Sequence, residues 1–187
     1  MMILERLVLE KEEEFSRMVT SHRGALLRFG LRRLRTSEQA EDLAAEAFAV
    51  AWRRFDDAPP VEQQLIWLYR IESLLLSNVY RSQRRLRSLE GRLAGLAIES
   101  DDEFLAGVDG KRMLLLAIGR LSQTEQEVLR LRYWEELSYR EIGVVLDCSE
   151  TAAGIRLSRA RRRLKMRFIQ ISKFGTENIE KGHRSER

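Results

Sequence analysis

Apolar residues recur at α-helical spacing through most of this chain. The clearest case is residues 38–55, where one stripe holds Ala40, Leu43, Ala44, Ala47, Phe48, Ala51 and Phe55. This i, i+3, i+4, i+7 pattern predicts an amphipathic helix with one buried face. Thr36 or Ser37 can cap its start, and Pro59 and Pro60 follow its end.

Helical spacing also predicts a long helix on each side of this one. Residues 3–35 form the first, with a break expected near residues 21–24. Residues 64–85 are apolar on nearly all sides, which predicts a helix at the centre of a bundle, and they end in a basic segment. A stretch rich in glycine and acidic residues then predicts a flexible linker over residues 91–110.

Four shorter helices are expected after the linker, near residues 111–120, 123–135, 138–146 and 149–168. Their starts carry capping signals: Ser122 with Glu125 or Thr124 with Glu127, then Ser138 with Glu141, and finally Ser149. The predicted fold class is therefore all-α, with two small helical domains at residues 1–90 and 111–168. Residues 169–187 are expected to form a loosely ordered tail.

The last two predicted helices have the layout of a helix-turn-helix, because only Asp147, Cys148 and Ser149 separate them. The second helix can enter a DNA major groove and read bases with its N-terminal residues. Its face away from the core carries Thr151, Ala152, Ile155, Arg156, Arg159 and Arg162. The alternative is an ordinary helical hairpin with a basic surface.

Charge is distributed unevenly along the chain. The net charge is +4 overall, but residues 1–80 carry −2 and residues 111–187 carry +7. Residues 155–167 hold seven basic residues and no acidic residue. Clustered arginine on a helix indicates a polyanion partner such as DNA. The acidic first domain is better suited to a protein surface than to duplex DNA.

Several functional classes are disfavoured by composition. With 44% hydrophobic residues the chain can form a core, and its single cysteine is typical of a reducing, cytoplasmic environment. The charged N-terminal residues do not resemble a signal peptide, and no apolar run is long enough to span a membrane. No catalytic or phosphate-loop motif is present, so we expect no enzyme activity, cofactor, metal or small-molecule substrate.

Both halves of the chain resemble one family. Residues 121–165 (LSQTEQEVLRLRYWEELSYREIGVVLDCSETAAGIRLSRARRRLK) resemble the promoter-recognition domain of bacterial RNA polymerase sigma factors. Residues 40–57 (AEDLAAEAFAVAWRRFDD) and 67–71 (WLYRI) resemble the domain of that family that binds core polymerase and melts the promoter. Two domains with a short linker resemble the extracytoplasmic-function group.

This resemblance implies a sigma factor that binds core RNA polymerase and directs promoter recognition and transcription initiation. Its implied partners are core RNA polymerase, promoter DNA and an anti-sigma factor. Polymerase binding is implied for Asp42, Leu43, Glu46, Phe48 and Arg53. Promoter melting is implied for Pro59, Pro60, Trp67, Tyr69, Arg70, Asn78, Arg81, Arg84 and Arg85. Promoter recognition is implied for Arg140, Ser149, Glu150, Thr151, Ala152, Ile155, Arg156, Arg159, Arg162 and Arg163.

Other interpretations of these residues stay open at the level of sequence. The charged face of residues 38–55 can be a solvated surface, and Trp67 and Tyr69 can be core aromatics. Arg163, like Arg161 and Lys165, is expected to contact phosphate or solvent rather than bases. A transcriptional regulator with an N-terminal sensing or dimerisation bundle, or an adaptor with a vestigial DNA-binding domain, would share the C-terminal half.

The chain departs from the family pattern at several positions. The loop over residues 56–66 lacks the glycine and aromatic residue that family members often carry. Asp147 stands where the turn usually has glycine, and Asp tolerates a left-handed conformation better than most residues. Gly154 weakens the recognition helix by roughly 1 kcal/mol relative to alanine. Leu74 stands where a polar residue is usual.

Overall fold

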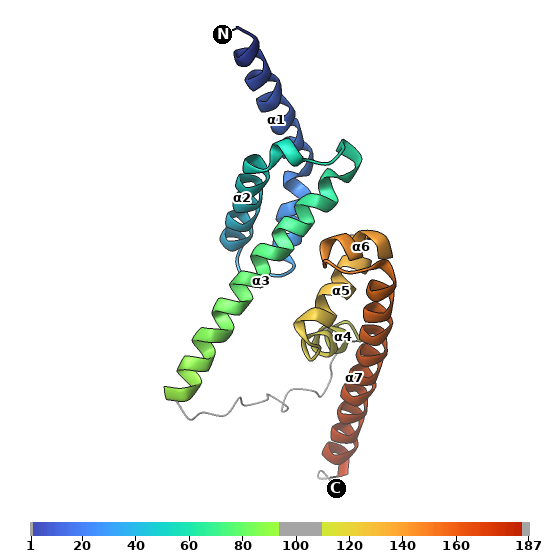
Figure 1. Ribbon diagram of the computed structural model, residues 1–187. Coiled ribbons are helices and arrows are strands. Elements are labelled where there is room, and N and C mark those ends of the chain that lie inside the picture. The colour runs from blue at the N-terminus through green and yellow to red at the C-terminus, as the bar shows by residue number, and fades with distance from the viewer. Residues whose placement is uncertain (1, 94–109, 185–187) are drawn as a thin grey trace. The chain divides into compact units, whose positions relative to one another are not determined.

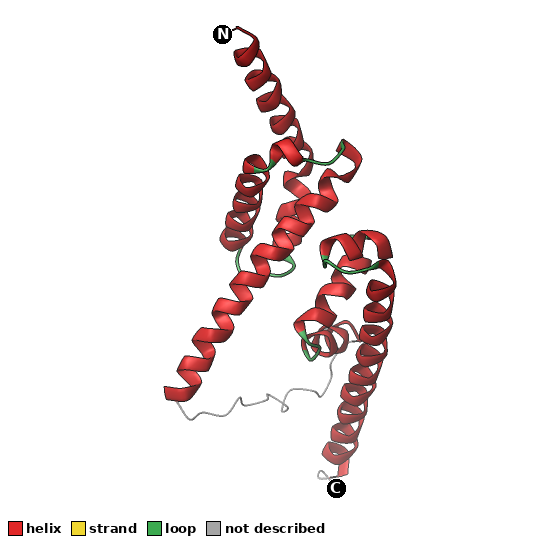
Figure 2. Cartoon of the chain, in the orientation of Figure 1, coloured by secondary structure: helices red, strands yellow, loops and turns green. Residues whose placement is uncertain are grey.

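A computed structural model describes residues 2–93 and 110–184, which form helices and connecting loops without a β-strand (Figure 2). The chain divides into two compact units. The first contains α1 to α3, and the second contains α4, α5, α7 and most of α6 (Figure 1). The all-α prediction is therefore confirmed. The predicted linker lies mostly outside the described residues.

The first unit begins with α1 (Met2–Leu31), which is one continuous helix. The break expected near residues 21–24 is wrong. An internal glycine such as Gly24 costs a helix only about 1 kcal/mol, and tertiary packing outweighs such local preferences. Met18, Leu26 and Phe29 of α1 are almost completely buried and supply that packing.

The next helix, α2 (Ser37–Arg53), follows the sequence prediction closely and is followed by a short 3-10 turn, η1 (Phe55–Asp57). The Thr36 hydroxyl caps α2 by accepting a hydrogen bond from the Gln39 amide at 3.2 Å. All seven residues of the predicted apolar stripe are buried. Gly30 of α1 allows a close approach, because a Cβ there would lie 3.0 Å from the Ala40 Cβ.

The third helix, α3 (Val61–Leu93), packs against both α1 and α2. Leu68, Ile71 and Leu76 are buried on its packed side, whereas Leu74 and Val79 are exposed. The central position predicted for this helix therefore holds only for one side of it. Some apolar side chains of α3 therefore lie outside the core of the unit.

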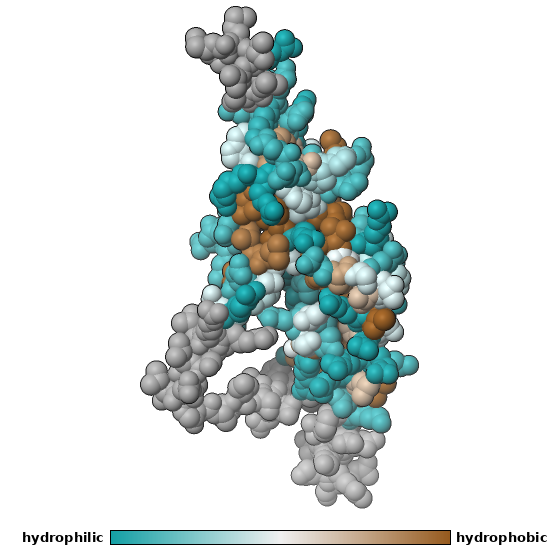
Figure 3. Space-filling view, viewed as in Figure 1, coloured by the Kyte–Doolittle hydropathy of each residue, from teal (hydrophilic) through white to brown (hydrophobic). Residues whose placement is uncertain are grey.

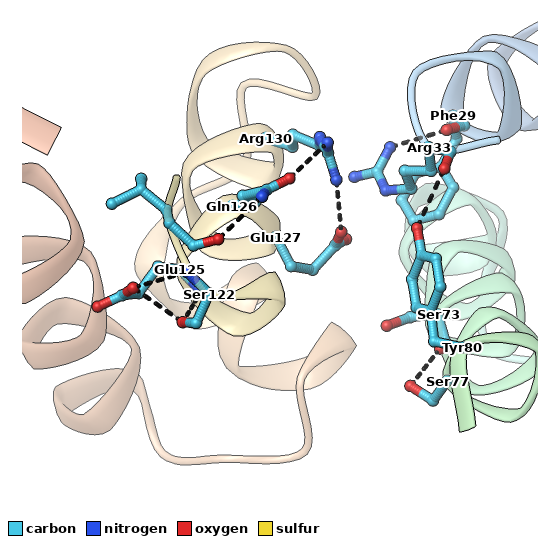
Figure 4. Close-up of polar contacts among 11 residues, drawn as sticks. Phe29, Arg33, Ser73, Ser77, Tyr80, Ser122, Glu125, Gln126, Glu127 and Arg130 are labelled. Atoms are coloured by element: carbon cyan, nitrogen blue, oxygen red, sulfur yellow. Dashed lines mark hydrogen bonds and ion pairs between the residues drawn. The ribbon is translucent and has the colours of Figure 1, made fainter. Parts of the chain in front are cut away.

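Among the described residues of this unit, the charged side chains of Arg33 and Glu72 are buried. The Arg33 guanidinium lies 3.4 Å from the centre of the Phe29 ring and donates a hydrogen bond to the Phe29 carbonyl at 2.9 Å (Figure 4). The Tyr80 hydroxyl donates to the Arg33 carbonyl at 3.1 Å. Buried charge is tolerated where aromatic faces and hydrogen bonds compensate for lost water.

The second unit contains α4 (Gly110–Gly119), α5 (Gln123–Tyr133), most of α6 (Tyr139–Val145) and α7 (Glu150–Arg184). Both α4 and α5 pack against α7. Ser122 and Glu125 form the capping box of α5 (Figure 4), so Ser122 rather than Thr124 marks its start. Ser138 and Glu141 make the equivalent reciprocal bonds at α6, at 2.7 and 3.3 Å.

The last helix is longer than its sequence pattern predicts. α7 runs to Arg184, whereas a helix end was expected near residue 168. Ile171 is completely buried with Ala117 of α4, and Met113, Leu164 and Phe168 pack around them. At least residues 169–173 therefore belong to the packed unit, which corrects the expectation that a loose tail begins at 169.

Candidate functional site

The helix-turn-helix has a tightly defined turn between α6 and α7. Asp147 has a φ of 52°, in the left-handed region, as its residue type allows. The Cys148 amide donates to the Gly143 carbonyl at 2.9 Å. The Ser149 hydroxyl accepts from the Ala152 amide at 3.1 Å and so caps α7. These contacts fix the direction in which α7 leaves the turn.

The first turns of α7 separate a buried face from a basic one. Ala153, Leu157 and Ala160 are buried. The residues predicted to face DNA are exposed, except for the half-buried Ala152: Thr151, Ile155, Arg156, Arg159 and Arg162. Among the described residues, these three arginines have no ion-pair or hydrogen-bond partner. Their guanidinium groups are therefore available to phosphate or base edges.

Two other arginines of α7 are held against α5. Arg163 donates to the Glu125 carboxylate at 2.7 Å. Arg161 donates to the Tyr133 hydroxyl at 2.7 Å, with its guanidinium 5.4 Å from the Tyr133 ring centre. The structure thus distinguishes Arg163 from the three unpaired arginines, although all four were proposed to bind DNA.

The carboxylate that holds Arg163 has a shifted pKa. Partial burial of Glu125 raises its pKa, but hydrogen bonds from the Ser122 hydroxyl and amide and the charge of Arg163 outweigh this effect. The net result is a pKa below the usual value. Glu125 is therefore ionised at neutral pH and joins the α5 cap to α7.

The remaining residues predicted to bind DNA lie around the turn. Arg140 of α6 is exposed, and so are Ser149 and Glu150. Ser149 already uses its oxygen as a helix cap. Glu150 lies in the first turn of α7, where a carboxylate interacts favourably with the helix dipole. The structure therefore provides local structural roles for Ser149 and Glu150.

The residues predicted to bind a protein partner on α2 fall into two groups. Asp42, Glu46 and Arg53 are exposed on the side opposite the buried stripe. Leu43 and Phe48 are buried, and Phe48 makes an edge contact with Phe15 of α1 at 6.4 Å. The charged group can meet a partner directly, whereas Leu43 and Phe48 hold the helix in place.

The segment predicted to melt DNA is similarly divided. Tyr69 is buried and stacks on Phe29 with ring centres 4.9 Å apart. It is therefore a core aromatic, which was the alternative interpretation of this residue. Trp67 and Arg70 are half-buried, whereas Asn78 and Arg81 are exposed. Arg84 and Arg85 belong to α3, but their side chains lie outside the described residues.

The loop before α3 borders a groove of about 970 Å³. Its lining combines the loop with the middle of α1: Pro59, Pro60, Asp56, Glu10, Glu14 and His22. Partial burial lowers the pKa of His22. The Lys11 ammonium spans the two sides through a 2.6 Å ion pair with Asp56. Sequence reasoning identified the loop but missed the contribution of α1.

Comparison with protein families identifies both units. The model described as Sigma-70 region 2 matches residues 18–86, and the model described as Sigma-70, region 4 matches residues 111–164. The two matches occur in order on the two folded units. The chain belongs to the sigma-70 family.

Other sigma factors are similar in sequence to this one over most of its length. "Probable RNA polymerase sigma factor RfaY" of Xanthomonas campestris pv. campestris is 30% identical over 166 residues, which are 85% of this chain but 41% of that protein. The chain thus spans less than half of that relative. "ECF RNA polymerase sigma factor SigW" of Bacillus subtilis is 26% identical over 171 residues, 86% of this chain and 91% of that protein.

Solved structures agree with this assignment. The sigma factor RpoE, in complex with the anti-sigma factor NepR from Bartonella quintana, has a TM-score of 0.58 and 26% identity. The match covers 83% of this chain and 96% of that one. The chain is therefore a sigma factor of the extracytoplasmic-function type. Promoter-directed initiation by RNA polymerase, the function expected from the sequence resemblance, is the function of this family.

The sigma factor also has features that sequence reasoning missed. An apolar groove of about 730 Å³ in the second unit is lined mainly by Leu114, Ile118, Tyr133, Trp134, Leu164 and Phe168. In the first unit, Trp52 is 38% exposed beside Phe15. Figure 3 shows brown, hydrophobic residues among hydrophilic ones on the surface of the first unit. Helical periodicity could not separate these residues from ordinary core positions.

The described residues hold neither a metal-binding cluster nor a membrane-spanning helix. No group of three or more His, Cys, Asp or Glu side chains in residues 2–93 and 110–184 could hold a metal ion. Within the same ranges, every helix is too short or too polar to cross a membrane.

Proposed function

We propose that this sigma factor docks on core RNA polymerase through the exposed charged side of α2. Asp42 and Glu46 are one helical turn apart, and Arg53 continues the same stripe about two turns further on. All three are exposed, while the opposite side of α2 is fixed in the unit core. A rigid helix that presents unburied charges is suited to a complementary protein surface.

The second unit is proposed to bind the upstream promoter element through α7. The observation that carries this proposal is the set of three exposed, unpartnered arginines, Arg156, Arg159 and Arg162, on the first turns of a capped recognition helix. Arginine can contact guanine bidentately or bind phosphate. Arg163 is proposed to act mainly through its ion pair with Glu125, which supports the position of α7 on α5.

The first unit is proposed to open the downstream promoter element. Pro59 and Pro60 border the groove that would accept an unpaired base, and Trp67, Asn78 and Arg81 follow along α3. Aromatic and arginine side chains are the usual ligands of single-stranded DNA. Tyr69 is assigned to the core of the unit, because it is buried against Phe29.

The cellular context of this sigma factor is proposed from its family. An anti-sigma factor is a proposed partner, since the RpoE structure contains one bound to a sigma factor of similar fold. A cytoplasmic location and the absence of catalytic activity are proposed as well, because a sigma factor acts on chromosomal DNA as a subunit of RNA polymerase.

Promoter-specific transcription tests this proposal directly. Core polymerase with the sigma factor should transcribe from a recurrent sequence that is selected out of a randomised promoter pool. Arg156→Ala should reduce that selection, whereas Lys173→Ala, which removes another exposed cation of α7, should not. If no sequence is enriched over core polymerase alone, the proposed function is wrong.

A further inference from the structure

Leu74 is an exposed aliphatic side chain in the middle of α3. Its exposed fraction is 53%, whereas Leu68, Ile71 and Leu76 of the same helix are buried. A single exposed leucine is common in proteins, so exposure by itself indicates nothing. The informative feature is the set of residues that share its side of the helix.

Leu74 lies on one stripe with Trp67, Asn78 and Arg81. At 100° per residue, these four positions fall within about 60° of one another around the helix axis. Trp67 is half-buried, and Asn78 and Arg81 are exposed. The stripe therefore presents an aromatic ring, an aliphatic chain, an amide and a guanidinium group in succession.

The dimensions of the stripe fit a short length of nucleic acid. Arg81 lies 14 positions after Trp67, which corresponds to about 21 Å along the helix axis. Stacked bases repeat every 3.4 Å along a strand, so this length corresponds to roughly six nucleotides. Leu74 buries less than half of its surface, so it contributes less to stability than a core leucine does.

The hydroxyl group three positions after Leu74 is used within the helix. The Ser77 hydroxyl donates to the Ser73 carbonyl at 2.9 Å. At the centre of the stripe, Leu74 is therefore an outward apolar group, with hydrogen-bonding and cationic side chains one and two turns further on.

We propose that Leu74 is an apolar wedge that inserts between bases while the promoter opens. The inference rests on the proposed melting role of α3. Inserted apolar side chains unstack a base step, and the surface that they bury offsets the cost of unstacking. Asn78 and Arg81 then bind the edges and backbone of the separated strand, which keeps it from pairing again.

Three variants test this role without disturbing the helix. Leu74→Ala removes the wedge and retains high helix propensity. Leu74→Met keeps a long apolar side chain. Val79→Ala is the matched control, because Val79 is also exposed, at 37%, but points about 140° away around α3.

The experiment compares two templates that carry the same promoter, selected beforehand by the wild-type holoenzyme. One is fully paired, and the other has the downstream element opened in advance by mismatches. The measured quantities are the rate of abortive RNA synthesis and the permanganate reactivity of unpaired thymines. Leu74→Ala should slow opening of the paired template about tenfold, equivalent to about 1.4 kcal/mol, and leave the opened template unaffected.

The control variants and the second template separate loss of the wedge from loss of binding or folding. Leu74→Met and Val79→Ala should match the wild-type protein on both templates. Normal opening by Leu74→Ala on paired DNA overturns the wedge, and so does an equal loss on both templates, which indicates binding or folding instead. If the wild-type holoenzyme selects no promoter at all, the proposed function itself is overturned, and the wedge with it.

Discussion

Two glycines of the helix-turn-helix should respond in opposite directions to alanine. Gly154 lies in α7, and a Cβ added there would have no atom within 4 Å. Alanine is favoured over glycine in helix interiors by about 0.8–1 kcal/mol. Gly154→Ala should therefore stabilise the second unit by nearly that amount.

Gly143 in α6 has no such space. A Cβ there would lie 2.6 Å from the carbonyl oxygen of Cys148, a backbone atom in the turn. The Cys148 amide is itself hydrogen-bonded to the Gly143 carbonyl, so the turn cannot move away without straining that bond. Overpacking of this kind costs about 1–3 kcal/mol, which exceeds the gain in helix propensity. Gly143→Ala should destabilise the unit by up to about 2 kcal/mol.

Urea denaturation followed by circular dichroism measures both changes in the full chain. Hydrogen exchange of peptides from α6 and α7 then shows whether the effect is located at the turn. The close approach of Gly143 to Cys148 is refuted if Gly143→Ala stabilises the protein as Gly154→Ala does.

Three further predictions concern α7. Arg156→Ala should weaken holoenzyme binding to the selected promoter by about 1–3 kcal/mol and spare random DNA, whereas Arg163→Ala should change promoter binding little. Fluorescence anisotropy at several salt concentrations separates these effects, and equal losses for both variants would contradict the assignment. The lowered pKa of Glu125 means that its stabilising contribution is complete above the usual carboxyl range and is lost as pH falls through the lowered value. Urea midpoints should therefore fall more steeply on acidification for wild type than for Glu125→Gln, and parallel curves would disprove the coupling. Ile171→Ala should cost about 2–5 kcal/mol, because Ile171 is fully buried, but Ile169→Ala at a 41% exposed position should cost little. Equal thermal stability of the two variants would show that α7 does not pack on α4 as described.

Local signals in the sequence predicted much of this fold correctly. The apolar stripe of α2 is buried at every predicted position, because the 3.6-residue period alone determines which residues share a face. Thr36, Ser122 and Ser138 cap helices through bonds to residues three positions later, so their role is visible in a four-residue window. Asp147 adopts the left-handed conformation that its short polar side chain permits.

Features that depend on distant residues were not predictable in the same way. Tyr69 is buried because Phe29 of α1 stacks on it, a contact across 40 positions. Leu43 and Phe48 were assigned to a partner although the stripe that contains them is the buried one. The continuation of α7 depends on Ala117 and Ile171 meeting, which no pattern within residues 169–187 reveals. The groove beside Pro59 and Pro60 likewise needs α1 for its other side.

Binding to core polymerase tests the central claim most directly. The purified sigma factor should co-elute with sigma-free core RNA polymerase on size exclusion, and so should Glu41→Arg, which alters an exposed residue about 100° away from Asp42 on α2. Asp42→Arg should remain folded by circular dichroism and fail to co-elute. A wild-type chain that is folded but does not bind core polymerase, or an Asp42→Arg variant that binds as well as wild type, would contradict the account.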